Sequence, residues 1–520
     1  MTLEKNASNP LRILFIKPYQ SQSQSKKGMH LGYSPPLGLI SIAATLRERF
    51  AEKIDVRMVD MKVLNEEPEL IVNYLKDFNP HIVGVSALNC EMSAAHKISE
   101  NTKQYNTNII TVLGGPYALH RAEEIFYKST FDWIFNGAAD LTFPEAVHCV
   151  ITGEDLGNDI VGFNYRKEDN SLQLSSGQDS IEDLNALPLP AWDLIDFDMY
   201  AGTKNMAFML KGKRYASLFT SRGCPYLCNY CHDLFTKKYV YQSPERVIEE
   251  IAYLYENYGV DEFQITDDIF NFHKPRLKAI FREVIRRWPG QLKFNFPNGV
   301  RADILDAECI ELMCKAGTYW CGIAIETVTP RLQKLVGKNL DIDKVGWAIS
   351  EFNKYKCGVT GFFMLGFPTE TAEEIEATID YILRSDITIA FIFHVNIHPG
   401  TPIFPLAEKE NAKALEKRLT DEGTYTVALS WYERAYGYPL QKMIKSTNLR
   451  FFLHPKRIWR IWERIPKKIL LKLFLQWLKL MLVNNKTSEL FQDKQQIVAT
   501  DQAVKQTIEP THTLKIKSGK

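Results

Sequence analysis

The chain has few of the features that would place it in a specialised class of protein. No uncharged apolar run reaches the roughly 18 residues that a membrane-spanning helix needs. The first ten residues, MTLEKNASNP, lack the apolar region of a signal peptide. The formal net charge is only +1 over 520 residues, which gives no overall electrostatic attraction to nucleic acid. We therefore expect a cytoplasmic protein that does not bind nucleic acid.

Cysteine is also sparse, with nine residues in the whole chain. Six of them show no regular spacing, which argues against a disulfide framework and suits a reducing compartment: Cys90, Cys149, Cys309, Cys314, Cys321 and Cys357. The other three, Cys224, Cys228 and Cys231, lie within eight residues of one another in a Cys-x3-Cys-x2-Cys pattern. The chemistry of this protein is therefore expected to centre on that short segment.

Three thiolates on one loop can bind three irons of a 4Fe-4S cubane and leave the fourth iron open to a substrate or cofactor. A structural zinc site would need a fourth Cys or His at a regular spacing, and the adjacent His232 is badly placed for it. Three unrelated core thiols are the remaining alternative. Tyr230, directly before Cys231, completes a Cys-x-aromatic-Cys ending.

This loop resembles the signature of the radical S-adenosylmethionine (radical SAM) enzymes. The resemblance implies that Cys224, Cys228 and Cys231 ligate a 4Fe-4S cluster and that Tyr230 lies against the adenine of S-adenosylmethionine. It also implies that the cofactor's methionine amino and carboxylate groups chelate the open iron. An external reductant such as flavodoxin or ferredoxin would then allow cleavage to a 5'-deoxyadenosyl radical.

Residues 11–151 alternate short β-branched runs with helical segments, which predicts a doubly wound, Rossmann-like parallel sheet. The predicted strands are 12–17, 55–60, 82–88, 108–113 and 132–135. Ligands of such sheets bind in the loops beyond the carboxyl ends of the strands. The sequence of those loops, with Pro35-Pro36-Leu37-Gly38 and Gly114-Gly115-Pro116, resembles the cobalamin-binding domain of one radical SAM subgroup. The resemblance implies cobalamin contacts from Tyr33, Ser86, Gly114, Gly115 and Pro116.

Two departures from that subgroup concern the cofactor. The Asp-x-His-x-x-Gly motif is missing, so no histidine from it would ligate cobalt. The usual Gly-Glu-Gly-Glu reads Gly137-Ala138-Ala139-Asp140, which we expect to weaken the polar contacts of those carboxylates. A ligand-free domain retained for packing is the alternative interpretation.

Residues 152–211 have the character of a linker with a small hairpin, and residues 212–405 return to alternating strands and helices. Six strands are predicted in the second region: 215–219, 261–265, 293–296, 320–325, 358–365 and 389–393. The resemblance implies that they form a partial (β/α)6 radical SAM barrel. Ser243 and Pro244 predict the start of a helix over 244–257, as an N-cap and a first-turn proline.

Polar residues follow several of these strands, at the end where barrel enzymes place their chemistry. The family resemblance implies that Asp267 or Asp268 holds the cofactor's amino group and that Glu326 lies near its ribose. Arg301 is the candidate for a bidentate contact with its carboxylate. Each of these residues alone is as easily a helix cap or a surface group. The segments 365–370 and 398–402 also fall where the family pattern expects them.

Beyond residue 405 we predict a helical region over 406–484 and a disordered tail over 485–520. We expect Trp431, Tyr432 and Tyr436 to be core residues rather than substrate contacts. Residues 450–483 are basic and rich in aromatic side chains, with an amphipathic helix expected over 467–483. Such a segment either contacts an anionic membrane surface or packs against the barrel.

Taken together, these features predict a C-methyltransferase that uses S-adenosylmethionine and cobalamin on a small or lipid-like substrate. An oxidative cyclase or rearranging enzyme of the same subgroup is the first alternative. A non-catalytic cobalamin-binding scaffold is the second, although a scaffold would not need an open iron.

Overall fold

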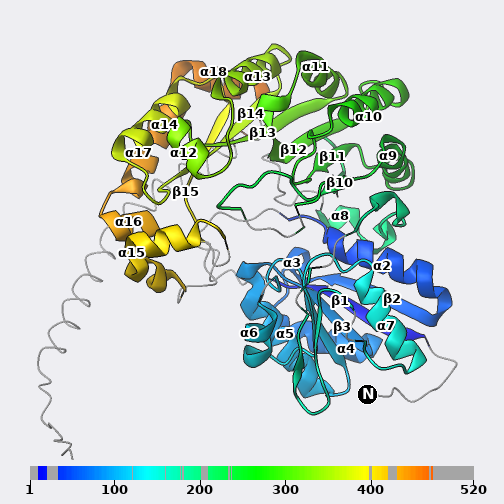
Figure 1. Cartoon of the computed structure of the whole chain (residues 1–520). Helices are drawn as coiled ribbons and strands as arrows, with labels where there is room; N and C mark the ends of the chain where they lie inside the picture. Colours follow the sequence, from blue (N-terminus) through cyan, green and yellow to red (C-terminus); the bar gives the residue numbers. More distant parts are fainter. Residues whose placement is uncertain are drawn as a thin grey trace, which may run out of the picture. The chain divides into compact units, whose positions relative to one another are not determined.

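The structure is a computed structural model, and it describes residues 10–19, 33–119, 121–157, 160–175, 177–178, 181–200, 209–231, 235, 237–397, 401–419, 430–467 and 470–471. The chain divides into two compact units, Met1–Arg457 and Ile458–Lys520. Both sheets belong to the first unit (Figure 1).

The first sheet has seven strands in the order β2-β1-β3-β4-β5-β6-β7, of which the first five are parallel. Its strands are β1 (Leu11–Lys17), β2 (Ile54–Asp60), β3 (Ile82–Ser86), β4 (Ile110–Gly114), β5 (Trp133–Phe135), β6 (Phe163–Arg166) and β7 (Leu172–Gln173). The five predicted parallel strands are all present, within three residues of their expected ends. The order 2-1-3-4-5 reverses direction between β1 and β3, which is where doubly wound sheets bind ligands.

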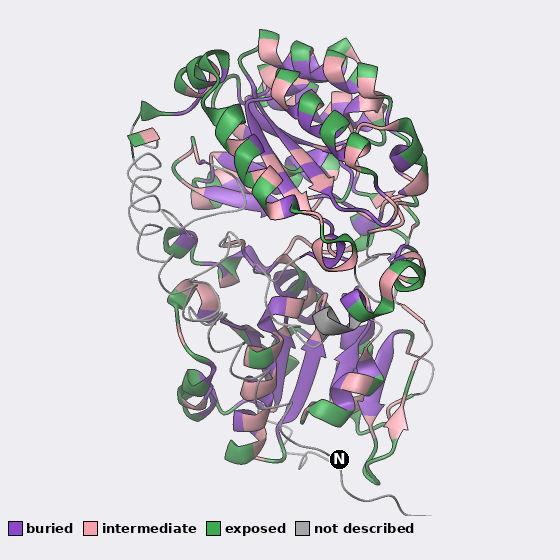
Figure 2. Ribbon diagram, turned by 90° about the vertical axis from the view of Figure 1, so that its left-hand side faces the viewer, coloured by how far each residue is buried: buried purple, intermediate pink, exposed green. Residues whose placement is uncertain are grey.

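Helices cover both faces of this sheet because successive side chains of β1 point to opposite sides. Ile13 and Phe15 belong to a core with α2 and α7, whereas Leu14 and Ile16 belong to a separate core with α4, α5 and α6. The helices are α2 (Leu37–Phe50), α3 (Met61–Leu64), α4 (Ile71–Phe78), α5 (Met92–Tyr105), α6 (Ala122–Lys128) and α7 (Thr142–Thr152). Figure 2 shows the buried strands between helices with exposed outer faces.

The hairpin predicted after this domain is formed by β6 and β7, which pair antiparallel. Strand β6 also pairs antiparallel with β5, at Trp133 and Tyr165. The hairpin therefore extends the first sheet, because the last parallel strand would otherwise leave its backbone hydrogen-bonding groups unpaired.

The second sheet has six parallel strands in the order β15-β14-β13-β12-β11-β8, and this open (β/α)6 arrangement confirms the predicted fold. The strands are β8 (Tyr215–Leu218), β11 (Glu262–Ile265), β12 (Lys293–Val300), β13 (Thr318–Glu326), β14 (Gly358–Leu365) and β15 (Ile389–His394). A short antiparallel pair, β9 (Ser221–Arg222) and β10 (Val240–Tyr241), follows β8 and encloses the cysteine loop.

The helices around the second sheet are α8 (Phe197–Tyr200), α9 (Pro244–Tyr258), α10 (Lys274–Arg287), α11 (Ala307–Lys315), α12 (Pro330–Leu335), α13 (Ile342–Lys354) and α14 (Ala372–Arg384). The predicted start of α9 is confirmed, because the Ser243 side chain accepts a hydrogen bond from the Arg246 N–H at 3.2 Å. Gly259 ends this helix with φ of 65°, a left-handed conformation that favours glycine.

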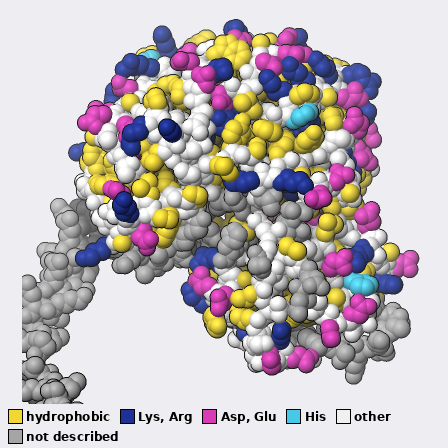
Figure 3. Space-filling view, in the orientation of Figure 1, with side chains coloured by type: hydrophobic (Ala, Val, Ile, Leu, Met, Phe, Trp, Pro, Cys, Tyr) yellow, Lys and Arg dark blue, Asp and Glu magenta, His cyan; other side chains and the backbone are white. Residues whose placement is uncertain are grey.

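The C-terminal helices are α15 (Phe404–Leu419), α16 (Trp431–Tyr436), α17 (Leu440–Phe452) and α18 (Pro455–Arg464). Trp431 and Tyr432 are buried, which confirms that they are core residues, whereas Tyr436 is 42% exposed. Most of the helix expected over 467–483 and all of the predicted tail lie outside the described residues. Within the described part of the chain, no helix is both long and apolar enough to span a bilayer. Figure 3 shows basic and acidic side chains interspersed over the face in view.

Candidate active site

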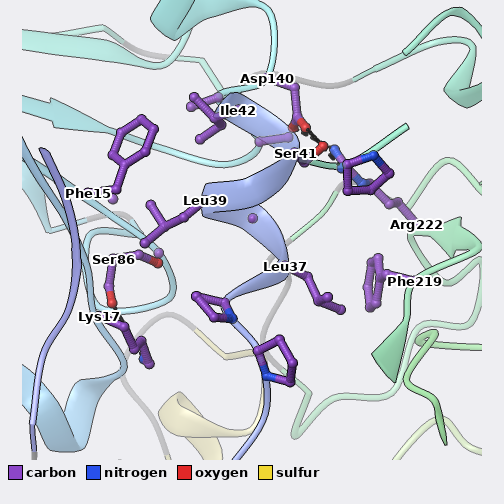
Figure 4. A pocket seen from close by; sticks show the side chains of 18 of the residues that line it. Phe15, Lys17, Leu37, Leu39, Ser41, Ile42, Ser86, Asp140, Phe219 and Arg222 are labelled. Atoms are coloured by element: carbon purple, nitrogen blue, oxygen red, sulfur yellow. Dashed lines mark hydrogen bonds and ion pairs between the residues drawn. The ribbon is translucent and has the colours of Figure 1, made fainter. Parts of the chain in front are cut away.

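A cavity of about 520 Å³ lies at the carboxyl edge of the first sheet. Residues at the ends of β1, β3 and β4 line it, among them Lys17, Ser86 and Gly114. Apolar side chains such as Phe15, Leu39 and Ile42 form much of the remaining wall (Figure 4). This is the position that the strand order predicts for a bound ligand.

Four of the five predicted cobalamin residues line this cavity: Ser86, Gly114, Gly115 and Pro116. Gly115 has φ of +86°, and a Cβ there would lie 2.9 Å from the Ala87 carbonyl oxygen, so only glycine fits where the two loops cross. Tyr33 is not among the lining residues. Its carbonyl oxygen instead accepts a 3.0 Å hydrogen bond from the Tyr215 hydroxyl of β8.

Residues of the second sheet line the same cavity. Ser217 and Phe219 lie at the end of β8, Thr266 follows β11, and Asn298 belongs to β12. The Ser34 hydroxyl, from the loop before α2, donates a hydrogen bond to the Ser217 hydroxyl at 3.2 Å. The carboxyl edges of the two sheets therefore face one shared space.

Asp140 forms a buried ion pair with Arg222, two residues before Cys224. Arg222 donates from Nη1 to Oδ2 at 2.7 Å and from Nη2 to Oδ1 at 3.1 Å, and Ser41 donates a further hydrogen bond (Figure 4). Burial opposes ionisation of Asp140, but the Arg222 guanidinium holds its pKa below the usual value. We expected the Gly137-Ala138-Ala139-Asp140 sequence to weaken the polar contacts made by the carboxylates of the usual Gly-Glu-Gly-Glu, and this stays a prediction; Asp140 itself is held by Arg222 and Ser41. The contact depends on Arg222, which lies 82 residues away.

The cysteine loop is held against the loop that follows α12. The Asn229 N–H donates to the Val336 carbonyl at 2.9 Å, and the Asn229 side chain donates to the Leu335 carbonyl at 2.7 Å. Gly337 has φ of +68°, and a Cβ there would lie 2.4 Å from the Leu227 carbonyl oxygen. Backbone atoms of the two loops are therefore in direct contact, which restricts the positions that the cysteines can take.

None of the three described cysteines of the loop is in a disulfide; Cys224 and Cys228 are half-buried and Cys231 is exposed. In the described part of the chain, no three His, Cys, Asp or Glu side chains converge on a position for a single metal ion. Cubane ligands bind different irons, so the three thiolates need not converge on one point. His232 lies outside the described residues. The loop fits a cluster with three protein ligands.

Asp267 and Asp268 have different environments. Asp267 is buried, and its carboxylate accepts hydrogen bonds of 2.6 Å from the Thr220 N–H, the Thr220 hydroxyl and the Ser221 hydroxyl. Burial raises its pKa, although Arg276 and these donors act in the opposite direction. Asp268 is exposed, and it accepts a 3.2 Å hydrogen bond from the Gly223 N–H, next to Cys224. Asp267 therefore braces the start of the loop, and Asp268 is the better candidate for a ligand contact.

Separate substitutions should distinguish these two roles. Asp267→Asn should lower the free energy of unfolding by about 3 kcal/mol, because buried donors lose a charged acceptor. Asp268→Asn should leave unfolding unchanged and weaken S-adenosylmethionine binding about tenfold or more, the value of one charge-assisted hydrogen bond. Urea denaturation and calorimetric titration of the cluster-loaded protein measure the two effects. The reverse pattern would contradict the assignment.

Glu326 lies in a buried group with Tyr230 and Lys338. The Lys338 ammonium is 2.9 Å from Glu326 Oε1, and the Tyr230 hydroxyl donates to the same oxygen at 3.3 Å. Glu326 has φ of 67°, where a bulge interrupts the pairing of β13 with β14. Such strain is typical of functional positions. Both of these contacts use Oε1, which, among the residues that the structure describes, leaves Oε2 as the candidate for a ligand contact. Burial, with the Glu326 charge, raises the pKa of Tyr230 and keeps its hydroxyl protonated.

Arg301 is committed to protein contacts. Its guanidinium forms an ion pair with Asp303 at 3.0 Å and donates to the Lys338 carbonyl at 2.9 Å. It also lies 3.7 Å from the ring centroid of Tyr226, within the cysteine loop. These contacts indicate that Arg301 holds the cysteine loop in place. They do not favour the predicted role, a contact with the cofactor's carboxylate.

The sequence did not reveal the roles of Arg222, Lys338 and Glu250. Arg222 is adjacent to the cysteine motif, which was a usable signal. Lys338 is 12 residues from Glu326 and Glu250 lies within α9, so neither belongs to a recognisable pattern. Only the positions of Lys338 and Glu250 in the folded chain connect these two residues to the site.

The fold and the site define an enzyme with two cofactor sites, a cysteine loop on one sheet and a large ligand cavity shared by both. Residues 218–382 match the Radical SAM superfamily, and residues 31–147 match the B12 binding domain. The chain is a radical SAM enzyme with an N-terminal B12-binding domain. It therefore uses a 4Fe-4S cluster, S-adenosylmethionine and cobalamin.

Two relatives and one solved structure illustrate the similarity. An uncharacterised methyltransferase of Pyrococcus horikoshii is 28% identical, over 81% of this chain and 88% of the relative. An anaerobic magnesium-protoporphyrin IX monomethyl ester cyclase of Rubrivivax gelatinosus is 24% identical, over 71% and 65%. The structure of the radical SAM methyltransferase TsrM from Kitasatospora setae, with cobalamin and a [4Fe-4S] cluster bound, has a TM-score of 0.62 at 16% identity, over 77% and 75%. The last similarity supports the fold.

Proposed function

We propose that this enzyme transfers a methyl group to an unactivated carbon atom of an apolar small molecule or lipid. The observation that carries the proposal is the shared cavity. Ser86 and Gly114 line it from the B12-binding domain, while Thr266 and Asn298 line it from the radical SAM domain. A substrate bound there would contact both domains, which would allow hydrogen removal and methyl addition to act on the same atom.

The chain's own residues would bind and orient the cofactors. We assign cluster ligation to Cys224, Cys228 and Cys231, the cofactor's amino group to Asp268, and its ribose hydroxyls to Oε2 of Glu326. Tyr230, held by Glu326 and Lys338, would contact the adenine. When bound, S-adenosylmethionine and the cluster supply a hydrogen-abstracting radical, and cobalamin supplies a methyl group.

The net reaction consumes two molecules of S-adenosylmethionine for each methylation. One accepts the hydrogen atom of the substrate C–H bond and yields 5'-deoxyadenosine and methionine. The other donates its methyl group to the same carbon and yields S-adenosylhomocysteine. Two electrons enter from an external reductant, for which a flavodoxin or ferredoxin is suitable. This balance makes the nucleoside products diagnostic of the reaction.

An aromatic surface inside the second sheet supports an apolar substrate. Phe362 of β14 stacks on Phe391 of β15 with centroids 5.9 Å apart, and Phe391 contacts Phe393 at 6.1 Å. Phe363 points the other way, toward Tyr381 of α14, so Phe362 faces the concave side. The rings of Phe362, Phe391 and Phe393 are all half-buried. Flat or aliphatic groups would pack well against them.

Membrane association belongs to the same proposal. Trp459 and Trp462 of α18 are 63% and 56% exposed, in a segment rich in Lys and Arg. Exposed tryptophans next to basic residues are suited to the interface of an anionic bilayer. A lipid substrate could then be taken up at the membrane surface.

A cyclase is the second candidate, because the Rubrivivax gelatinosus relative carries that name. The test uses the full chain, loaded anaerobically with cluster and hydroxocobalamin, and given reductant, substrate and S-adenosylmethionine with a deuterated methyl group. Methyl transfer predicts equal amounts of 5'-deoxyadenosine and S-adenosylhomocysteine, with deuterium in the product. A cyclase would form 5'-deoxyadenosine without substrate-dependent S-adenosylhomocysteine. If neither nucleoside appears, the catalytic proposal is wrong.

A further inference from the structure

One wall of the cavity carries two buried hydrogen-bond acceptors among mostly apolar residues. Glu250 extends from α9 and Gln242 follows β10, and both line the cavity. They are only 4% and 8% exposed. Both belong to the radical SAM domain, so they face a cofactor that is otherwise bound by the first sheet.

The Gln242 side chain has an unused acceptor. Its backbone N–H donates to the Thr220 carbonyl at 2.9 Å, and its backbone carbonyl accepts from Arg276 Nε at 2.7 Å. The side-chain Oε1 is buried and has no hydrogen-bond partner among the described residues. An unsatisfied buried acceptor costs about 1–3 kcal/mol, which a donor on a bound ligand would recover.

Glu250 is a buried carboxylate with two neighbouring donors, the Trp192 indole and the Gln242 side-chain amide. Its Oε1 accepts a 3.0 Å hydrogen bond from Trp192 Nε1. A carboxylate has about four acceptor positions, so these two donors leave it with capacity to spare. Burial raises the pKa of Glu250 to about 7, although Trp192, Arg246 and Gln242 act in the opposite direction. The nearby Arg246 forms its ion pair with Glu249 instead. Glu250 can therefore accept a further hydrogen bond from a ligand.

We propose that Glu250 and Gln242 form a subsite for the primary carboxamide groups at the edge of the corrin ring. A primary amide offers two N–H donors, which match the Gln242 Oε1 and the Glu250 carboxylate. It carries no charge, so its burial needs no counter-ion. A carboxylate at the same position would be repelled by Glu250. The subsite rests on cobalamin binding in this cavity and explains how the radical SAM domain recognises that cofactor.

The test compares cobalamin with its monocarboxylic acids, in which one carboxamide is hydrolysed. The apo full-length chain is titrated with hydroxocobalamin and with each acid isomer, and binding is followed by absorbance. We expect at least one isomer to bind the wild type about tenfold more weakly than cobalamin, a difference of about 1.4 kcal/mol. Glu250→Gln should reduce that difference to about twofold by removing the repulsive charge. Equal binding of all isomers by the wild type would overturn the proposal.

Matched variants separate recognition from general effects on folding. Glu262 is another buried carboxylate with a raised pKa, but it does not line the cavity. Glu262→Gln should therefore keep the wild-type discrimination. Gln242→Leu should weaken cobalamin binding about three- to tenfold, the value of one hydrogen bond. Gln264→Leu should leave it unchanged, since Gln264 is buried with an unpartnered side chain away from the cavity.

The remaining outcomes also decide the question. If Glu250→Gln keeps the discrimination, or if Gln242→Leu binds cobalamin like the wild type, the subsite is wrong while the cobalamin cavity stands. If the wild type binds no hydroxocobalamin at all, the subsite and the proposed methyl transfer both fail. Thermal unfolding of each variant shows whether a change in affinity arises from loss of the fold.

Discussion

Cys228→Ala should abolish the cleavage of S-adenosylmethionine. The rate of 5'-deoxyadenosine formation should fall at least about 10³-fold, a modest part of the roughly 10⁶-fold or greater acceleration that enzymes provide. The physical reason is that two thiolates cannot keep the cubane in the geometry that leaves one iron open. Iron content and the visible absorbance of the reconstituted protein should fall in parallel, which provides a readout independent of activity.

A second cysteine offers a matched control for that experiment. Cys314 is half-buried like Cys228 but lies on α11, outside the cysteine loop. Cys314→Ala should retain the wild-type iron content and the wild-type rate of cleavage. Persistent turnover in Cys228→Ala would show that the loop does not ligate the cluster. Zinc in the purified, anaerobically loaded protein would lead to the same conclusion.

Asp140→Ala is expected to cause the largest loss of stability. The substitution leaves the Arg222 guanidinium buried without its carboxylate, since the two side chains are 13% and 4% exposed. Removing one partner of a buried ion pair costs about 3–5 kcal/mol. Urea denaturation should show this loss as a lower free energy of unfolding. Because Arg222 lies two residues before Cys224, the same change should also loosen the cysteine loop and slow cluster loading.

The control for this prediction is an exposed pair with the same geometry. Arg214 and Asp198 form a bidentate contact, but their side chains are 39% and 68% exposed. Asp198→Ala should cost less than about 1 kcal/mol, as solvent-exposed pairs usually do. A double-mutant cycle on Asp140 and Arg222 should give a coupling of about 2–3 kcal/mol. A coupling below about 0.5 kcal/mol would mean that the two side chains do not stabilise each other.

The contrast between the two pairs bears on how the enzyme coordinates its cofactors. Asp140 ends the loop after β5 in the B12-binding domain, and Arg222 begins the cysteine loop of the radical SAM domain. A charged, directional contact at this point holds the start of the cysteine loop against the B12-binding domain. An apolar contact would allow the two loops to slide past each other. We therefore infer that the main role of the Asp140–Arg222 pair is to fix the relative position of the loops, more than to add stability.

The sequence by itself determined the features that depend on local spacing. The Cys-x3-Cys-x2-Cys pattern located the cysteine loop, and the alternation of apolar runs and helices located eleven parallel strands in two sheets. The apolar residues of strands and helices recur at regular spacings along the sequence, so these elements can be recognised before the tertiary structure is known. The Gly114-Gly115-Pro116 motif was recognisable because it is also a local pattern. Gly115 allows the backbone of this loop to approach a neighbouring loop closely.

The tertiary structure alone decided which polar side chains act on ligands and which hold the protein together. Asp267 and Asp268 are adjacent in sequence, yet one accepts three internal hydrogen bonds and the other is exposed beside Cys224. Arg301 donates to the Lys338 carbonyl, while Glu250 and Gln242 reach the cavity from elements with no motif. Charge and hydrogen-bonding partners come from contacts tens of residues apart in sequence. Those contacts exist only after the strands have been brought side by side.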